Sequence, residues 1–211
     1  TEAGSSGSRD NTPQVLVPTA PGTSVIGNER ISLDISNTAE GYLCARYAGS
    51  ASRIKIFIIT PDEVKYTYDL TAADDWAVLP LTGGNGVYQI EVYENVEGTS
   101  YSTLFKEPSL SVSLNDEFRP FLYPNQYTWF TADSETVKKA AELAQNADSD
   151  LDVITNVYNF TIGTIVYDDD KAAEAETGAL AGYLPDVDQV LESGKGICFD
   201  YAALMTCMLR T

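Results

Sequence analysis

The chain has 211 residues, enough for two modest domains or one large one, and 44% of them are hydrophobic, which allows a real core and argues against global disorder. Its 31 acidic and 13 basic residues give a net charge of −18, which repels nucleic-acid backbones and anionic lipid, so we expect neither as a partner. No apolar run reaches the roughly 18 residues that a membrane span requires, and 3 cysteines do not make a disulfide framework.

Residues 1–24 are rich in serine, glycine, threonine and proline and show no apolar periodicity. This composition predicts a flexible linker. Such an opening, with the many tyrosine, threonine and serine residues that follow, is typical of an exported protein trimmed of a signal or anchoring segment. We therefore expect a secreted or cell-surface protein.

Residues 25–118 form short runs in which apolar and polar side chains alternate, with turn signals between them. Alternation with a period of two predicts strands that have one face in a core. The number of runs favours an immunoglobulin-like β-sandwich. Cys44 lies on one of these strands and is expected to be a small buried side chain. The predicted strands are Ile31–Ile35, Gly41–Tyr47, Ile54–Ile59, Val64–Leu70, Trp76–Pro80, Val87–Tyr93, Tyr101–Phe105 and Leu110–Leu114.

Residues 119–211 change to helical spacing after an extended connector. Asp133 or Ser134 is expected to cap a helix that reaches about Asn146. Asp148, Ser149 or Asp150 is expected to cap a second helix, whose apolar positions follow helical spacing. Those positions are Leu151, Ile154, Val157, Tyr158, Ile162 and Ile165.

Three consecutive aspartates, Asp168–Asp170, follow the second helix. We interpret them as a solvated helix end rather than a cation site, because metal-binding loops space their ligands around a turn. No metal and no cofactor is expected. Residues 171–185 predict a surface loop, and 185–192 predict a short helix that ends at Gly194.

A cysteine, Cys198, stands at the start of an apolar helix directly after two glycines. Helix N-termini favour a thiolate, because their unpaired N–H groups and the helix dipole stabilise an anion. Gly194 and Gly196 allow a tight turn and leave room for a substrate, and the N–H of Cys198 is a candidate donor to an oxyanion. Helix position alone does not distinguish a reactive Cys198 from a buried structural one. Cys207, in mid-helix, is expected to be structural, and the expected core anchors are Ala202, Leu204, Met205 and Leu209.

The sequence contains 0 histidines, although a cysteine nucleophile normally relies on a histidine base. We therefore expect the chain to be the first part of an enzyme whose other catalytic residues lie beyond Thr211. As it stands, the chain is expected to be inactive.

The stretch from Tyr183 to Thr211 resembles the core of the transglutaminase-like superfamily. In that family a short polar helix precedes a Gly-x-Cys-x-Asp-Tyr-Ala motif, which stands here as Gly196–Ala202. The likeness extends over about residues 119–211 and implies the helical N-terminal portion of an α+β domain. It also implies that Cys198 is the nucleophile of a papain-like Cys-His-Asp triad, with Asp200 as a polar brace and Tyr201 as a packing residue. The histidine, the triad aspartate and their sheet follow this helix in the family.

The resemblance implies a cysteine hydrolase or acyltransferase that acts on the peptide or amide bonds of a protein or peptide through a thioester at Cys198. The alternative is a non-catalytic surface protein, binding or structural, whose transglutaminase-like domain is degenerate. Without the family's sheet, the Cys198 helix is expected to keep an apolar face bare. Such a face favours a homo-oligomer.

Overall fold

The computed structural model describes residues 9–70 and 75–211, whose contacts divide them into two units. Residues 17–126 form one unit, and residues 9–16 together with 127–211 form the other. The boundaries expected from the sequence, after residues 24 and 118, stay predictions about independently folding domains. The first part of the predicted linker, residues 1–8, lies outside the described residues.

The described part of the predicted linker, residues 9–24, is extended and forms no helix or strand. At its start, the Arg9 guanidinium pairs with the Asp150 carboxylate at 2.7 Å, within the helical unit. Near its end, the Gly22 N–H donates to the Asp34 carboxylate at 2.7 Å, within the sandwich unit. Each end of this segment is therefore held against its own unit.

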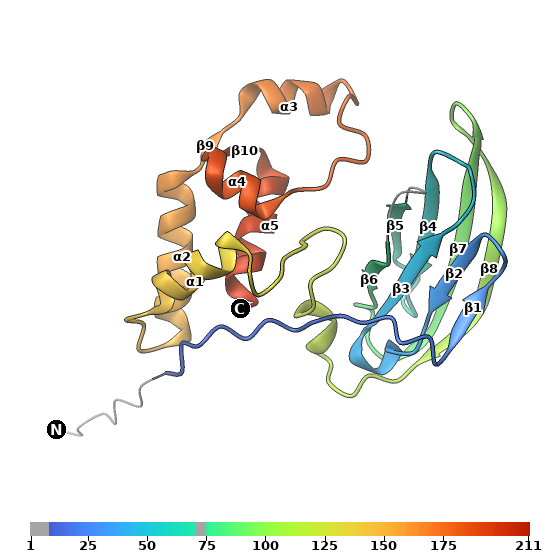
Figure 1. The fold of residues 1–211 in the computed structure, drawn as a ribbon, viewed down its shortest axis with the longest axis horizontal. Coiled ribbons are helices and arrows are strands. Elements are labelled where there is room, and N and C mark those ends of the chain that lie inside the picture. Colours follow the sequence, from blue (N-terminus) through green and yellow to red (C-terminus); the bar gives the residue numbers. More distant parts are fainter. Residues whose placement is uncertain (1–8, 71–74) are drawn as a thin grey trace. The chain divides into compact units, whose positions relative to one another are not determined.

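Residues 17–126 form the predicted β-sandwich of two four-stranded antiparallel sheets (Figure 1). One sheet has the order β1-β2-β3-β6 and the other the order β5-β4-β7-β8. Two 3-10 turns, η1 (Thr38–Glu40) and η2 (Arg119–Phe121), belong to the same unit. The strands are β1 (Val25–Gly27), β2 (Ile31–Asp34), β3 (Tyr42–Tyr47), β4 (Ile54–Ile59), β5 (Lys65–Leu70), β6 (Ala77–Pro80), β7 (Gly86–Glu97) and β8 (Ser100–Val112).

The alternation read from the sequence sets which face of each strand enters the sandwich core. In β4, Ile54, Ile56 and Ile58 are fully buried, and the residues between them are only partly buried. Cys44 on β3 is also buried, as expected. Burial, and then the charge of Asp34, raises the pKa of the Cys44 thiol to about 12.

The last two predicted strands are one long strand, β8, and the interruption expected after Phe105 was wrong. The intervening residues keep their pairing with β7, where Glu91 lies opposite Lys106 and Ile90 opposite Glu107. Register shifts in this ladder accommodate the extra residues, and β8 is an edge strand, where Pro108 is tolerated because it needs no ladder donor.

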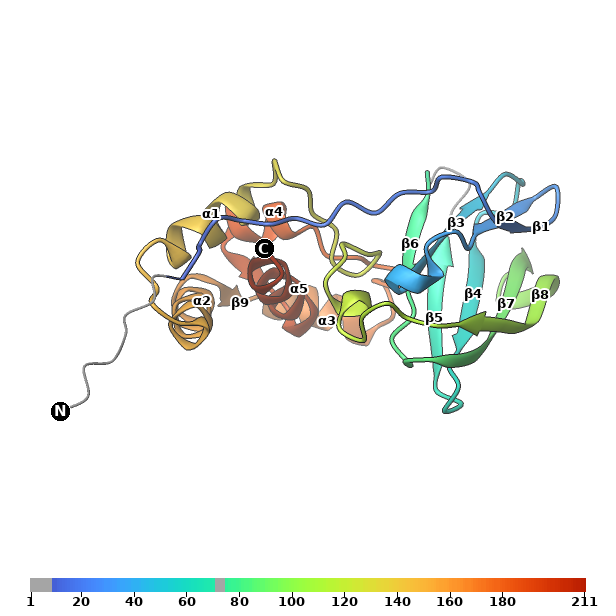
Figure 2. The same ribbon diagram turned by 90° about the horizontal axis from the view of Figure 1, so that it is seen from below.

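Residues 127–211 form a helical unit in which α5 contacts α1, α2 and α4 (Figure 2). Its apolar core is built mainly from valine and alanine side chains, most of them on these helices. None of the helices in residues 9–70 and 75–211 is long and apolar enough to cross a membrane. The elements are α1 (Glu135–Ala144), α2 (Asp150–Thr164), β9 (Val166–Tyr167), α3 (Asp169–Glu176), α4 (Val187–Ser193), β10 (Lys195–Gly196) and α5 (Cys198–Leu209).

Helix α2 starts where the sequence predicts, because the Ser149 hydroxyl caps it by accepting from the Asp152 N–H. Helical spacing alone does not say which face of α2 is buried. The face in the core carries Val153, Val157 and Thr161, and Thr161 satisfies its hydroxyl by donating to the Val157 carbonyl. The six apolar positions that indicated the helix divide between two sides: Val157 and Ile165 are buried, whereas Leu151, Ile154, Tyr158 and Ile162 are exposed.

The segment predicted as a surface loop, residues 171–185, is partly helical. Helix α3 begins at Asp169, and the Asp168 carboxylate caps it by accepting from the Lys171 N–H at 3.0 Å. The aspartates therefore lie at the start of a new helix rather than at the end of α2. Carboxylates stabilise this end of a helix through its dipole.

Candidate functional site

Cys198 is the first residue of α5, and its side chain is exposed. The residue before it, Ile197, has an extended backbone and serves as the N-cap. Further back, Gly194 ends α4 in the left-handed conformation with a φ of 63°, a geometry that glycine adopts without strain. The sequence-predicted order of a short helix, a glycine turn and a helix beginning at the cysteine is therefore present.

A two-stranded parallel ladder fixes the backbone just before Cys198. β10 pairs with β9, so that Lys195 lies opposite Val166 and Gly196 opposite Tyr167. The Val166 N–H donates to the Gly194 carbonyl at 2.8 Å. This ladder joins the chain that leaves α2 to the chain that enters α5.

Asp200, in the first turn of α5, is fully buried and strongly bonded. Its Oδ2 accepts from the Ile197 N–H at 2.8 Å, which satisfies a donor at the helix start. Oδ2 also pairs with the Lys171 ammonium at 2.7 Å, and Oδ1 accepts from the Tyr183 hydroxyl at 2.6 Å. The brace predicted at Asp200 thus reaches well beyond its own helix.

Lys171 and Tyr183 complete a closed cluster with Asp200. The Lys171 ammonium donates to the Tyr183 hydroxyl at 2.6 Å and lies 4.0 Å from the centre of that ring. Burial alone would lower the pKa of Lys171, but the hydrogen bonds to Asp200 and Tyr183 outweigh it and raise that pKa. Burial, followed by the hydrogen bond to Asp200, raises the pKa of Tyr183. Lys171 is therefore held as a cation.

The sequence analysis missed Lys171 and Tyr183, although one signal pointed to such partners. Asp200 is an acidic residue among the apolar residues of α5, and a buried carboxylate requires a cation or several donors. Spacing cannot identify those donors, because they lie 29 and 17 residues away in the sequence.

The other motif residues lie around this cluster. Gly196 is buried, and a Cβ added to it would come 2.6 Å from the Asp200 Cβ, so only glycine fits. The Tyr201 hydroxyl donates to the Ile165 carbonyl, which links α5 to the end of α2. Phe199 meets the Tyr183 ring edge-on, with centroids 6.4 Å apart. Gly194, Gly196, Asp200 and Tyr201 are thus brought together around Cys198.

Only some of the residues predicted to anchor α5 in the core are buried. Leu204 is fully buried as expected, but Ala202 and Leu209 are exposed, because they fall on the opposite side of the helical turn. The buried residues recur at helical spacing: Asp200, Ala203, Leu204, Cys207 and Met208. Burial, and then the charge of Asp188, raises the pKa of the Cys207 thiol to about 12, which fits its expected structural role.

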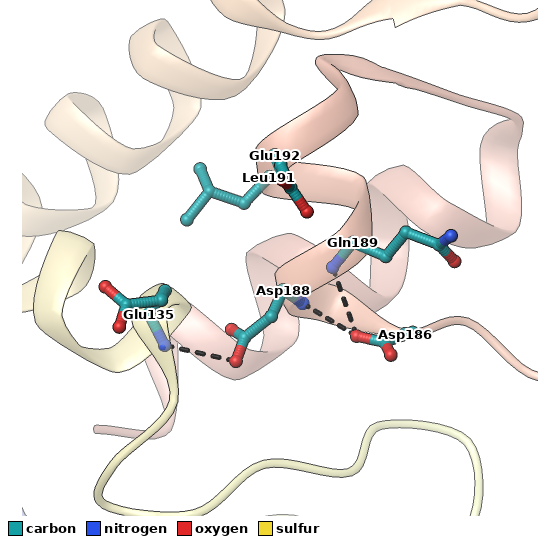
Figure 3. Close-up of a pocket in the computed structure, with 6 residues that line it drawn as sticks. All are labelled: Glu135, Asp186, Asp188, Gln189, Leu191 and Glu192. Atoms are coloured by element: carbon teal, nitrogen blue, oxygen red, sulfur yellow. Dashed lines mark hydrogen bonds between the residues drawn. The ribbon is translucent and has the colours of Figure 1, made fainter.

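A separate acidic pocket lies between the start of α1 and helix α4 (Figure 3). The Asp188 carboxylate accepts from the N–H groups of Glu135 and Thr136, at 3.1 and 2.8 Å. Asp186 accepts from the N–H groups of Asp188 and Gln189, both at 3.1 Å. These two carboxylates therefore cap helix starts, and Cys198 is not among the residues that line the pocket.

Among the residues described here, no group of three or more His, Cys, Asp or Glu side chains is arranged to hold a metal ion. The chemistry that this site offers is that of an exposed thiol at a helix start. Asp200, in the same turn as this thiol, is buried and forms an ion pair with Lys171 of α3.

Comparison with known proteins gives one match. The model of the transglutaminase-like superfamily matches residues 137–211, which include α5 and the whole of the Gly196–Ala202 motif. No curated protein and no solved structure matches the chain significantly.

Proposed function

We propose, on the premise that residues 137–211 form a transglutaminase-like superfamily domain, that the protein is a cysteine hydrolase or acyltransferase with Cys198 as its nucleophile. The observation that carries the proposal is the exposed thiol at the first position of α5, within the matched residues. Cys44 and Cys207 are buried and their pKa is raised to about 12, so neither suits this role.

In the proposed reaction, the Cys198 thiolate attacks the carbonyl carbon of a peptide or amide bond. The carbon–nitrogen bond breaks, the amine leaves with a proton, and the acyl group remains on Sγ as a thioester. Water or a second amine then attacks the thioester carbon and releases the acyl group, and the thiolate returns. The backbone N–H groups of the first turn of α5 are the donors that we propose for the oxyanion.

The proton balance requires a base for the thiol and an acid for the leaving amine. Histidine usually performs both tasks, and this sequence has 0 histidines. We therefore propose that these roles belong to a group outside residues 1–211. The chain alone is expected to form a thioester with an activated ester but not to turn it over.

The test is acylation of the folded chain by p-nitrophenyl acetate. We expect a burst of about one equivalent of p-nitrophenolate per chain, followed by no steady release, since acylation of one thiol without deacylation stops after one event. Peptide mapping should place the acetyl group on Cys198, and hydroxylamine should remove it. Cys198→Ser is the matched control and should abolish the burst.

Two results would contradict the proposal. A burst that survives in Cys198→Ser would locate the reactive group elsewhere. A Cys198 that reacts no faster than an unfolded peptide spanning residues 194–203 would favour the alternative, a binding or structural protein that keeps the cysteine helix for structure alone.

We also propose a protein or peptide substrate and a secreted or cell-surface location. The superfamily match supports the substrate class, and the many tyrosine, threonine and serine residues of the chain support export. Fractionation of the source cells tests the location, and recovery only from the cytosol would contradict it.

A further inference from the structure

A buried carboxylate lies two residues after the proposed nucleophile, on the same helical turn. Asp200 is fully buried, and its Oδ2 is bonded to the N–H of Ile197, the residue directly before Cys198. Side chains two positions apart on a helix point in different directions, but a carboxylate charge buried in the same turn still disfavours a second negative charge, because poorly solvated like charges repel. A thiolate on Cys198 therefore requires that the Asp200 charge be balanced.

Lys171 supplies that balance from a different element. Its ammonium pairs with Oδ2 of Asp200 at 2.7 Å, and its side chain is 22% exposed. Lys171 lies on α3, which follows β9, so the cation reaches the first turn of α5 from the connection between α2 and α4. The ion pair carries no net charge, so it does not oppose the effect of the helix dipole on an anion at the start of α5.

Tyr183 fixes the geometry of the pair. Its hydroxyl bonds both partners, at 2.6 Å to Asp200 Oδ1 and 2.6 Å to the Lys171 ammonium. Its ring also meets Phe199, which lies between Cys198 and Asp200 in the sequence. The titratable or charged groups in the cluster are thus Lys171 from α3, Tyr183 from the connection and Asp200 from α5, with Asp168 engaged in capping α3.

We infer that Lys171 is a positioning residue for Cys198, which neutralises Asp200 and, with Tyr183, holds the connection between α3 and α4 against the first turn of α5. This inference rests on the proposed function, since it states what permits a thiolate at Cys198. Lys171 itself touches no reacting atom. It acts through Asp200.

The experiment measures the alkylation rate of Cys198 in the full chain with iodoacetamide as a function of pH, read by peptide mass spectrometry. Lys171→Met leaves the Asp200 charge unbalanced, so the midpoint of the profile should rise and the rate near neutral pH should fall roughly tenfold, the effect of about one pKa unit. Asp200→Asn leaves the Lys171 cation unbalanced, so its midpoint should fall. The double variant, Lys171→Met with Asp200→Asn, should return close to the wild-type profile. Lys171→Arg keeps the positive charge and should also give the wild-type profile.

Opposite shifts from the two single variants distinguish charge balance from simple loss of structure, because disorder would move both profiles in one direction. Circular dichroism checks the fold of each variant. If Lys171→Met does not fold, Asp200→Asn decides alone: a lowered midpoint supports the inference and an unchanged or raised one overturns it.

Failure of the inference differs from failure of the proposed function. A folded Lys171→Met with the wild-type profile overturns the role of Lys171, while Cys198 remains reactive and the proposed function stands. A wild-type Cys198 that alkylates no faster than the unfolded peptide spanning residues 194–203 overturns the proposed function, and the inference with it.

Discussion

The two units each bury an aspartate, but they satisfy it by different means. In the sandwich, Asp34 accepts from the backbone N–H groups of Gly22 and Ser36, at 2.7 and 2.9 Å. In the helical unit, Asp200 depends on the side chains of Lys171 and Tyr183 as well as one backbone N–H. Backbone donors survive most substitutions, whereas side-chain donors can be lost one at a time. Single substitutions should therefore change the stability of the Asp200 cluster more than that of the Asp34 site.

Removing Asp200 should cause the largest loss of stability. Asp200→Ala leaves Lys171 and Tyr183 without their acceptor, and breaking a buried ion pair from one side costs about 3–5 kcal/mol. Urea unfolding followed by far-UV circular dichroism measures the loss. Asp150→Ala is the control, because Asp150 pairs with Arg9 while its side chain is 87% exposed. That variant should lose less than about 1 kcal/mol, and equal losses would contradict the comparison.

A smaller effect is expected when Asp200 is displaced without being removed. In Gly196→Ala the new methyl group would come 2.6 Å from the Asp200 Cβ, so the first turn of α5 has to shift. Such overpacking costs about 1–3 kcal/mol, which thermal unfolding measures. In Gly163→Ala the methyl group meets no atom within 4 Å, and this helical position should gain up to about 1 kcal/mol. If Gly196→Ala left the unfolding temperature unchanged, the close approach of residue 196 to Asp200 would not matter for stability.

Removing one hydroxyl from the cluster should cost less again. Tyr183→Phe deletes the O–H that donates to Asp200 and the oxygen that accepts from Lys171, and keeps the ring beside Phe199. A hydrogen bond to a charged group contributes about 1.5 kcal/mol or somewhat more. Tyr93→Phe is the control, because it removes one hydrogen bond to the partly exposed Glu91 carboxylate instead of two, and it should lose less stability than Tyr183→Phe. Chemical unfolding measures both losses. Equal unfolding midpoints for Tyr183→Phe and wild type would show that the Tyr183 hydroxyl does not contribute to stability.

The sandwich aspartate should show its contribution mainly as a dependence on pH. Burial raises the pKa of Asp34, but the hydrogen bonds from Ser36 and Gly22 outweigh it, so the net pKa is lowered. A lowered pKa in the folded state stabilises above the unfolded value of about 3.9, and this stabilisation is lost as pH falls through the folded value. Asp34→Asn should lose about 1 kcal/mol at neutral pH, with the difference from wild type vanishing under strongly acidic conditions. A stability difference between Asp34→Asn and wild type that stays constant across the acid range would contradict the lowered pKa of Asp34.

The sandwich was predictable because its information is local. Ile54, Ile56 and Ile58 alternate with less buried residues, and that alternation alone assigns them to the core. The start of α5 at Cys198 was also readable, because Gly194 and Gly196 mark the turn before it. Both conclusions require only neighbours in the sequence.

The buried face of α2 was not predictable by the same reasoning, because the helix carries two stripes at helical spacing. The more apolar stripe, with Leu151, Ile154 and Tyr158, is the exposed one. The buried stripe includes Thr161, which hides its hydroxyl by bonding the carbonyl one turn back. The partners of Asp200 were not predicted for a related reason: tertiary contacts, and not periodicity in the sequence, determine them.

The short ladder of β9 and β10 closes the chain on itself around everything between Tyr167 and Lys195. A loop whose two ends are pinned side by side tolerates changes in its length, because the entropy of closure grows only by about 0.6 kcal/mol for each doubling. Near Gly178 and Gly182, both at positive φ, a Cβ would meet no atom within 4 Å. A foreign peptide such as an epitope or a fluorophore tag can therefore be inserted at the exposed Gly178, whereas an insertion at Gly182 would disturb the neighbouring Tyr183.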